Sequence, residues 1–340
     1  MNNLLRIFLQ VLITTAVFAF GACDSGTNSE RPGAGDGDAD SDSDADSDGD
    51  SDSDSDVEEA ELILPIERDD AYALELETTT GTLLFECTAD NGGRITRFEF
   101  NDVNILVGPE DGSMFGATFW TSPQNWGWPP PDVFDNESYD VDVDESTGTI
   151  VLSSSDDNST GVQIIKTFEA NLAQNAIDIT YTLRNTGDST VSYSPWEISR
   201  VPEGGLTFFR QGSGGGSDNN YGTMDTQVVD GIVWYEHPLN TTSDNKLFDD
   251  SEDGWIAHTD GNLLFIKTFD QADEVPSSEG EIEIYATTGY VEVEQQGSYV
   301  ALASGEELSW NLTWRLIDIP DNISVKAGSG DLVTLVDDAI

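Results

Sequence analysis

Basic residues are scarce in this chain. Its 340 residues include 13 lysines and arginines against 66 aspartates and glutamates, which gives a formal net charge of -53. Nucleic-acid binding requires clustered cationic side chains, and a phosphate backbone is repelled by a surface this acidic. The composition therefore excludes a nucleic-acid partner, and no protein partner is inferable from it.

Cysteine and histidine are also rare, at two residues each. Two cysteines cannot supply a disulfide framework or a Cys-ligated zinc site. The chain has no Gly-x-Ser-x-Gly elbow, zinc-binding helix motif or P-loop lysine, so we expect neither a metal nor a cofactor. Cys87 ends a strand-like stretch of alternating residues and is expected to be a buried thiol.

No apolar run is long enough to span a membrane. The longest, residues 7–19, is too short to cross a hydrocarbon core of about 30 Å and has the length of a signal-peptide core. Gly21-Ala22-Cys23 follows it and resembles the bacterial lipobox. We therefore expect a signal peptide at 1–22 and a lipid on Cys23, which would anchor the protein to a membrane of the bacterial cell envelope, on its periplasmic or cell-surface face. The alternative is an ordinary secretory cleavage site.

The remaining chain divides by composition. Residues 23–61 are rich in Asp, Ser and Gly and predict a disordered acidic tether, because they cannot bury enough apolar surface to offset their ordering entropy. From residue 62 to 340, apolar and polar residues alternate in many short segments, such as 177–183 and 308–314. No stretch of ten or more residues shows a clear helical period. These features predict a single all-β domain, an antiparallel sandwich or barrel.

An aromatic segment at 108–136 interrupts the alternation and is expected to be a long loop. It contains Trp120, Trp126 and Trp128, with Gln124 between them. Indole faces stack on the C–H faces of sugars, and an amide can bond hydroxyl groups, so this loop is a candidate carbohydrate-binding surface. The alternative is a satellite core in which the rings pack inward.

Several distinctive motifs occur along the chain, namely Gly92-Gly93-Arg94-Ile95, Thr118-Phe119-Trp120, Trp128-Pro129-Pro130, Trp196-Glu197-Ile198-Ser199-Arg200-Val201-Pro202, Gly254-Trp255 and Tyr290-Val291-Glu292-Val293-Glu294-Gln295-Gln296-Gly297. Together they resemble an uncharacterised bacterial lipoprotein family of the galactose mutarotase-like (aldose 1-epimerase-like) superfamily. The resemblance runs from about Leu74 to Ile317 and implies a large antiparallel β-supersandwich that binds sugars.

Aldose 1-epimerases of this superfamily use a Glu base and a His acid, because ring opening removes the O1 proton while the ring oxygen is protonated. The resemblance implies Glu294 as the base, with Glu292 as its neighbour on the same strand face. His258 and His237 are the candidate acids, although the epimerase Asn-His motif is absent. For each histidine a structural role is the simpler interpretation, and for Glu294 it is a solvent-facing strand position.

Three further polar residues complete the predicted site. Glu197 and Arg200 lie on one segment with Trp196, and Lys267 is one of the few lysines. An arginine can hold a carboxylate in a two-point fork, which suits an acidic sugar, whereas a structural ion pair is the alternative. The sequence thus predicts a membrane-anchored lipoprotein with a carbohydrate-binding domain. The alternatives are an aldose or uronate epimerase and a non-catalytic structural surface protein.

Overall fold

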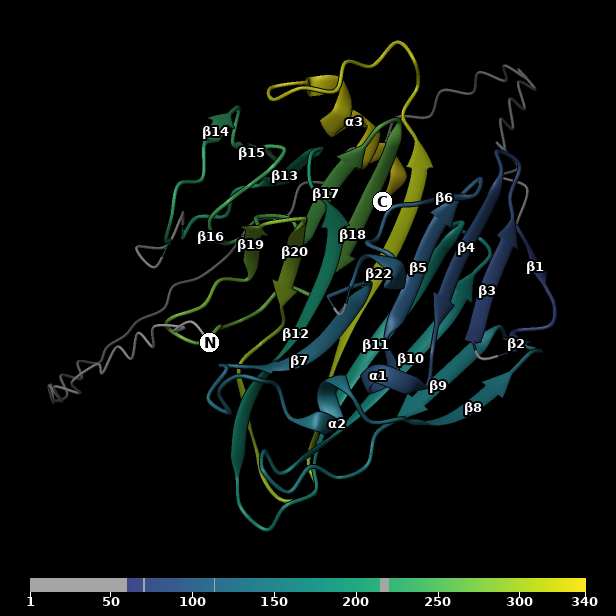
Figure 1. Ribbon diagram of the computed structural model, residues 1–340, viewed down its shortest axis with the longest axis vertical. Coiled ribbons are helices and arrows are strands. Elements are labelled where there is room, and N and C mark those ends of the chain that lie inside the picture. Colours follow the sequence, from purple (N-terminus) through teal and green to yellow (C-terminus); the bar gives the residue numbers. More distant parts are fainter. Residues whose placement is uncertain (1–59, 70, 113, 215–219) are drawn as a thin grey trace, which may run out of the picture. The chain divides into compact units, whose positions relative to one another are not determined.

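We describe a computed structural model of the chain for residues 60–69, 71–112, 114–214 and 220–340. The predicted signal peptide, Cys23 and nearly all of the predicted tether lie outside the described residues. The described part of the chain is dominated by antiparallel strands that form two large sheets (Figure 1). The all-β prediction is therefore confirmed.

The first sheet has twelve strands, with the order β1-β3-β4-β5-β7-β12-β20-β19-β16 along its main path. Three short strands lie off this path: β2 pairs with β3, β6 with β5 and β21 with β12. Its strands are β1 (Glu61–Ile63), β2 (Glu67–Arg68), β3 (Ala71–Glu77), β4 (Thr82–Cys87), β5 (Ile95–Phe100), β6 (Val103–Asn104), β7 (Ala117–Ser122), β12 (Val191–Pro202), β16 (Asn245–Asp249), β19 (Ile282–Thr287), β20 (Tyr290–Gln296) and β21 (Val300–Leu302).

The second sheet has ten strands in the order β14-β15-β13-β17-β18-β22-β11-β10-β9-β8. Its long central strands are the segments whose alternation is clearest in the sequence. Its strands are β8 (Asp140–Asp144), β9 (Thr149–Ser153), β10 (Val162–Asn171), β11 (Ala176–Asn185), β13 (Leu206–Arg210), β14 (Thr226–Val229), β15 (Ile232–Glu236), β17 (Trp255–Asp260), β18 (Leu263–Phe269) and β22 (Glu307–Asp318).

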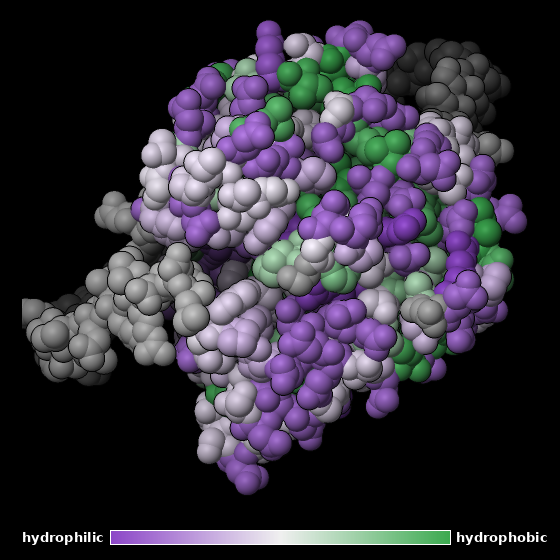
Figure 2. All heavy atoms as spheres, viewed as in Figure 1, coloured by the Kyte–Doolittle hydropathy of each residue, from purple (hydrophilic) through white to green (hydrophobic). Residues whose placement is uncertain are grey.

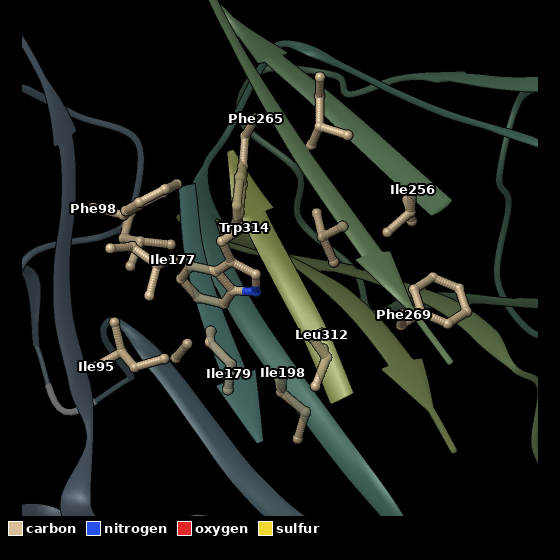
Figure 3. Close-up of a cluster of buried hydrophobic side chains, with 14 of the residues drawn as sticks. Ile95, Phe98, Ile177, Ile179, Ile198, Ile256, Phe265, Phe269, Leu312 and Trp314 are labelled. Atoms are coloured by element: carbon tan, nitrogen blue, oxygen red, sulfur yellow. The ribbon is translucent and has the colours of Figure 1, made fainter. Parts of the chain in front are cut away.

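Aromatic side chains fill the space between the two sheets. Trp314 of β22 packs edge-on against Phe98 of β5, at 5.3 Å between ring centroids, and against Phe265 of β18 (Figure 3). Phe119 of β7 stacks on Tyr181 of β11 at 4.1 Å. The Phe98–Trp314 and Phe119–Tyr181 contacts join the inner face of one sheet to that of the other, as in other face-to-face sandwiches. Cys87 is buried and unpaired, as predicted, and burial raises the pKa of its thiol.

The prediction of one long loop at residues 108–136 is wrong in its middle, because β7 runs from Ala117 to Ser122. All six residues of β7 are buried, so both of its faces are covered and the segment shows no alternation of polar and apolar residues. Such a segment cannot be distinguished from a buried loop by periodicity alone. Trp120 is therefore held on a strand in the interior of the first sheet.

The helices are few, but one contradicts the expectation that no ten-residue stretch is helical. Helix α3 spans Gly330–Ala339 and buries Leu332 and Val336, which lie one turn apart. Its short apolar stripe is too brief to give a clear period in the sequence. The other helices are single turns: α1 (Asp90–Gly93), α2 (Asp132–Asp135) and the 3-10 helix η1 (Pro109–Asp111). Within the described residues, no helix is both long and apolar enough to cross a bilayer.

A buried ion pair connects the inner faces of the two sheets. The ammonium of Lys267 on β18 donates to Glu197 of β12 at 2.8 Å, to Ser199 at 3.1 Å and to the carbonyl oxygen of Val293 at 2.6 Å. Glu197 also accepts from the Ser199 hydroxyl and from the amide of Gln295. Most of the visible surface, by contrast, is hydrophilic (Figure 2). The pair is therefore a buried polar connection between the two sheets.

We expect Lys267→Met to lower the free energy of unfolding by about 3 to 5 kcal/mol, because it leaves the buried Glu197 carboxylate without its counter-ion. Urea unfolding of the two proteins measures this difference. In the double variant Lys267→Met/Glu197→Gln no buried charge remains, so stability should recover in part. A single variant as stable as the parent would contradict the assignment.

Candidate functional site

The outer face of the first sheet carries a row of polar and aromatic side chains on five neighbouring strands. The antiparallel registers place Trp120 opposite Trp196, Arg200 opposite Glu292, and Glu283 opposite Glu294. Side chains of residues opposite each other point to the same face, so these strands present one continuous surface. Its residues are Thr118 and Trp120 on β7, Trp196 and Arg200 on β12, Glu292, Glu294 and Gln296 on β20, Glu283 and Tyr285 on β19, and Lys246 and Phe248 on β16.

A hollow of about 390 Å³ opens on this face. Six of the ten residues that line it are aromatic, and only Lys246 and Glu292 are charged. This combination of apolar walls with a few polar groups is typical of small-molecule sites. The lining residues are Met114, Trp120, Gln124, Trp128, Trp196, Tyr221, Lys246, Tyr285, Tyr290 and Glu292.

Trp120 is the centre of the aromatic wall. Its ring lies 5.6 Å from Trp196, 5.9 Å from Trp126 and 6.1 Å from Trp128, each in an edge-to-face arrangement. Trp126 donates to the carbonyl and hydroxyl oxygens of Thr121 and does not line the hollow. Trp128 is 66% exposed, so its face is open to a ligand. The predicted aromatic site thus consists of the buried ring of Trp120 and the exposed ring of Trp128.

Lys246 links the hollow to two buried carboxylates. Its ammonium lies 2.8 Å from both oxygens of Glu294 and 2.6 Å from Glu283. The indole N–H of Trp196 also donates to Glu294, at 2.8 Å. The same ammonium lies over the rings of Trp196 and Tyr285, at 5.2 and 5.9 Å. Glu294, the predicted base, is therefore fully buried beneath Lys246 and Trp196 and does not line the hollow. It is not the solvent-facing residue of the alternative interpretation either.

The electrostatics of this cluster follow from two carboxylates sharing one ammonium. Burial raises the pKa of Glu294 and of Glu283, and Lys246 opposes the rise in both. Burial lowers the pKa of Lys246, but the two carboxylates outweigh it, so the pKa is raised overall. Lys246 is therefore a fixed cation whose charge is already matched by its neighbours.

Arg200 forms a second matched pair beside the first. Its Nε lies 2.9 Å from Glu292, its Nη1 donates to the hydroxyl of Thr118 at 3.2 Å, and its guanidinium lies 5.7 Å from the centre of the Trp120 ring. Burial, followed by the charge of Glu292, raises the pKa of Tyr290 to about 12, so this phenol at the hollow stays protonated. Arg200 thus sits behind the Glu292 and Trp120 side chains.

Glu197 and Lys267, which were predicted to contact a carbohydrate, do not face the hollow. Residues alternate along β12, so Trp196 and Arg200 point outward, whereas Glu197 points to the space between the sheets. There Glu197 is bound to Lys267 and both side chains are almost fully buried. The prediction is corrected for these two residues: they form the structural ion pair that was the alternative interpretation.

The two histidines form a separate buried cluster on the second sheet. The hydroxyl of Thr207 lies 2.8 Å from Nε2 of His237 and 3.0 Å from Nδ1 of His258. Neither histidine lines the hollow beside Lys246. His237 instead lines a different hollow with Glu203, Glu236 and other residues. The structure therefore does not place a histidine with Glu294 and Glu292.

Both histidines are held neutral. Burial lowers the pKa of His258 to about 3, assisted by Lys267, and lowers the pKa of His237 well below its usual value. The unfolded chain binds protons at histidine near pH 6.5. Between pH 6.5 and 3 the unfolded state therefore holds more protons than the folded state, and the histidine contribution to stability is lost as the pH falls.

We expect each histidine to make the free energy of unfolding fall by up to about 1.4 kcal/mol per pH unit below pH 6.5. Urea unfolding at pH 7, 6 and 5 measures this slope. His258→Gln and His237→Gln should each reduce it, and comparison with the parent removes the contribution of the carboxylates. An unchanged slope in both variants would show that the buried rings accept protons in the folded state.

Sequence reasoning missed several residues of the site, above all Lys246, which lines the hollow, and its buried partner Glu283. Residues 245–249 were not recognised as a strand, because all five are buried and show no alternation. The scarcity of lysine was the available signal. Within the described part of the chain, no group of three or more His, Cys, Asp or Glu side chains is arranged to hold a metal ion.

Several solved structures are similar to this fold at low sequence identity. A TPR-domain containing protein from Parabacteroides distasonis matches with a TM-score of 0.51 and 12% identity, over 75% of this chain and 49% of that one. A protein provisionally named an aldose 1-epimerase from Escherichia coli K12 gives 0.49 and 11%, over 73% and 100%. A galactose mutarotase-like protein from Lactobacillus casei gives 0.47 and 9%, over 72% and 100%. At these identities the likeness concerns the fold.

Among curated protein sequences, none matches the chain. Residues 120–317 match the model of a family described as a domain of unknown function, DUF4380. These residues begin at the Trp120 of the hollow and end within β22, so they include most of the residues that line the site. They make up more than half of the chain, and the protein therefore belongs to the DUF4380 family.

Proposed function

We propose that the hollow on the outer face of the first sheet is a carbohydrate-binding site. The observation that carries the proposal is its lining, in which six aromatic rings surround a few polar groups. Its volume of about 390 Å³ lies within the range of small-ligand sites. The proposal agrees with the mutarotase-like resemblance of the sequence motifs.

The lining matches the two kinds of surface that a sugar ring presents. The open face of Trp128 can stack on the C–H groups of a sugar ring, and the edge-to-face contact with Trp120 helps to orient the Trp128 ring. The amide of Gln124, the phenols of Tyr285 and Tyr290 and the carboxylate of Glu292 supply donors and acceptors for hydroxyl groups.

The proposal is limited to binding, because the parts of an epimerase are not assembled at the hollow. A base there must reach a sugar hydroxyl, whereas Glu294 is engaged on both oxygens by Lys246 and on one by Trp196. The histidines bond to Thr207 elsewhere. The epimerase alternative would require Glu292 or Lys246 to act in place of the predicted residues.

Trp128→Ala should weaken sugar binding about tenfold, equivalent to about 1.4 kcal/mol, because it removes the exposed stacking face. Isothermal titration calorimetry of the full chain against neutral aldoses measures the loss. Leu239→Ala is the matched control, since Leu239 is 69% exposed and lines a different hollow. Sugar affinity that is equal in the parent and in Trp128→Ala would remove this tryptophan from the site, and an absence of sugar binding by the parent would overturn the proposal.

We also propose that the protein is a lipoprotein of the bacterial cell envelope, held to a membrane through Cys23. The support is the short apolar segment followed by Gly21-Ala22-Cys23, together with the acidic residues that follow. We expect such a tether to separate the carbohydrate-binding domain from the membrane surface, because its like charges repel one another.

Mass spectrometry of the protein from a bacterial membrane fraction tests the anchor. We expect an N-terminal peptide that begins at Cys23 and carries acyl chains, and we expect Cys23→Ser to move the protein to the soluble fraction. Cys87→Ser is the matched control, because Cys87 is buried in the domain. A mature N-terminus at another residue would contradict the assignment of Cys23 as the lipidated residue.

A further inference from the structure

A guanidinium that a ligand cannot reach lies behind the lining of the hollow. Arg200 is only 1% exposed and does not itself line the hollow. Its Nε is paired with Glu292 and its Nη1 with Thr118, which leaves donors that these two contacts do not use. A guanidinium in this position is the usual partner for a carboxylate or phosphate. Here that position is filled by a side chain of the protein.

Glu292 stands between Arg200 and the hollow. The two residues are directly opposite each other on β12 and β20, and the Glu292 side chain, 11% exposed, belongs to the lining. The other cation of the site is matched in the same way, because Lys246 lies between Glu283 and Glu294. Two cations thus face three carboxylates, and no cation of the site is left to pair with a ligand.

We propose that Glu292 is a specificity-determining residue, which occupies Arg200 and thereby restricts the hollow to sugars without a negative charge. The inference rests on the proposed carbohydrate site and names the class of sugar it takes. It replaces the expectation from the sequence that Arg200 would hold the carboxylate of an acidic sugar.

The physical reason is the balance between desolvation and pairing. A uronate or a sugar phosphate that enters the hollow loses water from its charged group, and this loss is recovered only if a cation pairs with it. It meets Glu292 instead, and like charges a few ångströms apart repel strongly where the surroundings are of low polarity. A neutral pyranose avoids both costs and retains the stacking and hydroxyl contacts.

Calorimetric titration of the full chain with matched sugars tests the inference. The probes are glucose, galactose and mannose, each paired with its uronate, at neutral pH and moderate ionic strength. We expect at least one neutral sugar to bind, and its uronate to bind at least tenfold more weakly. A uronate that binds as tightly as its neutral partner overturns the charge selection and leaves carbohydrate binding intact. If no sugar of either kind binds, the proposed function fails together with this inference.

Variants of Glu292 test its role. Glu292→Gln removes the charge at nearly constant shape, and Glu292→Ala also opens a path to Arg200, so both should raise uronate affinity relative to the neutral sugar, by about tenfold or more. Glu292→Asp should retain the discrimination, and Glu236→Gln, which removes an exposed carboxylate from a different hollow, controls for net charge. If Glu292→Ala does not fold, Glu292→Gln decides the matter. An unchanged ratio of affinities in Glu292→Gln overturns the assignment.

Discussion

The ion pair between Glu197 and Lys267 is the interaction on which the arrangement of the two sheets depends. It joins β18 of the second sheet to β12 and β20 of the first, through the Glu197 carboxylate and the carbonyl oxygen of Val293. It is also part of a wider pattern, because many of the few cationic side chains of this acidic protein are buried. More than half of the lysines and arginines in the described part of the chain are buried, namely Arg94, Lys166, Arg200, Lys246, Lys267 and Arg315.

The same strands support both stability and the site, because their alternate residues face opposite ways. On β12, Glu197 belongs to the interior and Trp196 to the hollow; on β20, Val293 faces the interior and Glu292 the hollow. The lining residues on strands, such as Trp120, Trp196 and Glu292, are therefore held by a backbone that the core has already fixed. Trp128, the most exposed ring of the lining, lies instead in the segment between β7 and α2.

Sequence reasoning reached the fold through the alternation in strands such as β11 and β22, where one face is buried and the other is solvated. It failed where strands are buried on both faces, and this concealed β7 and β16, and with β16 the lysine at the centre of the site. It grouped Glu197 with Arg200 because the two are close along the chain, although residues three apart on a strand point to opposite faces. Strand parity alone could have separated these two residues. The pairing of Lys246 with Glu283 and Glu294 could not have been predicted, because it depends on which strands become neighbours.

Because many lysine and arginine side chains are buried, few remain on the surface to neutralise its carboxylates. With so few bases left at the surface of a chain of net charge -53, the exposed carboxylates repel one another with little local neutralisation. Dissolved salt screens such repulsion over a Debye length of about 10 Å at 0.1 M, whereas the buried pairs are largely insulated from it. Added salt therefore weakens the repulsion between surface carboxylates while the buried ion pairs stay intact. The folded domain is thereby stabilised in a saline medium.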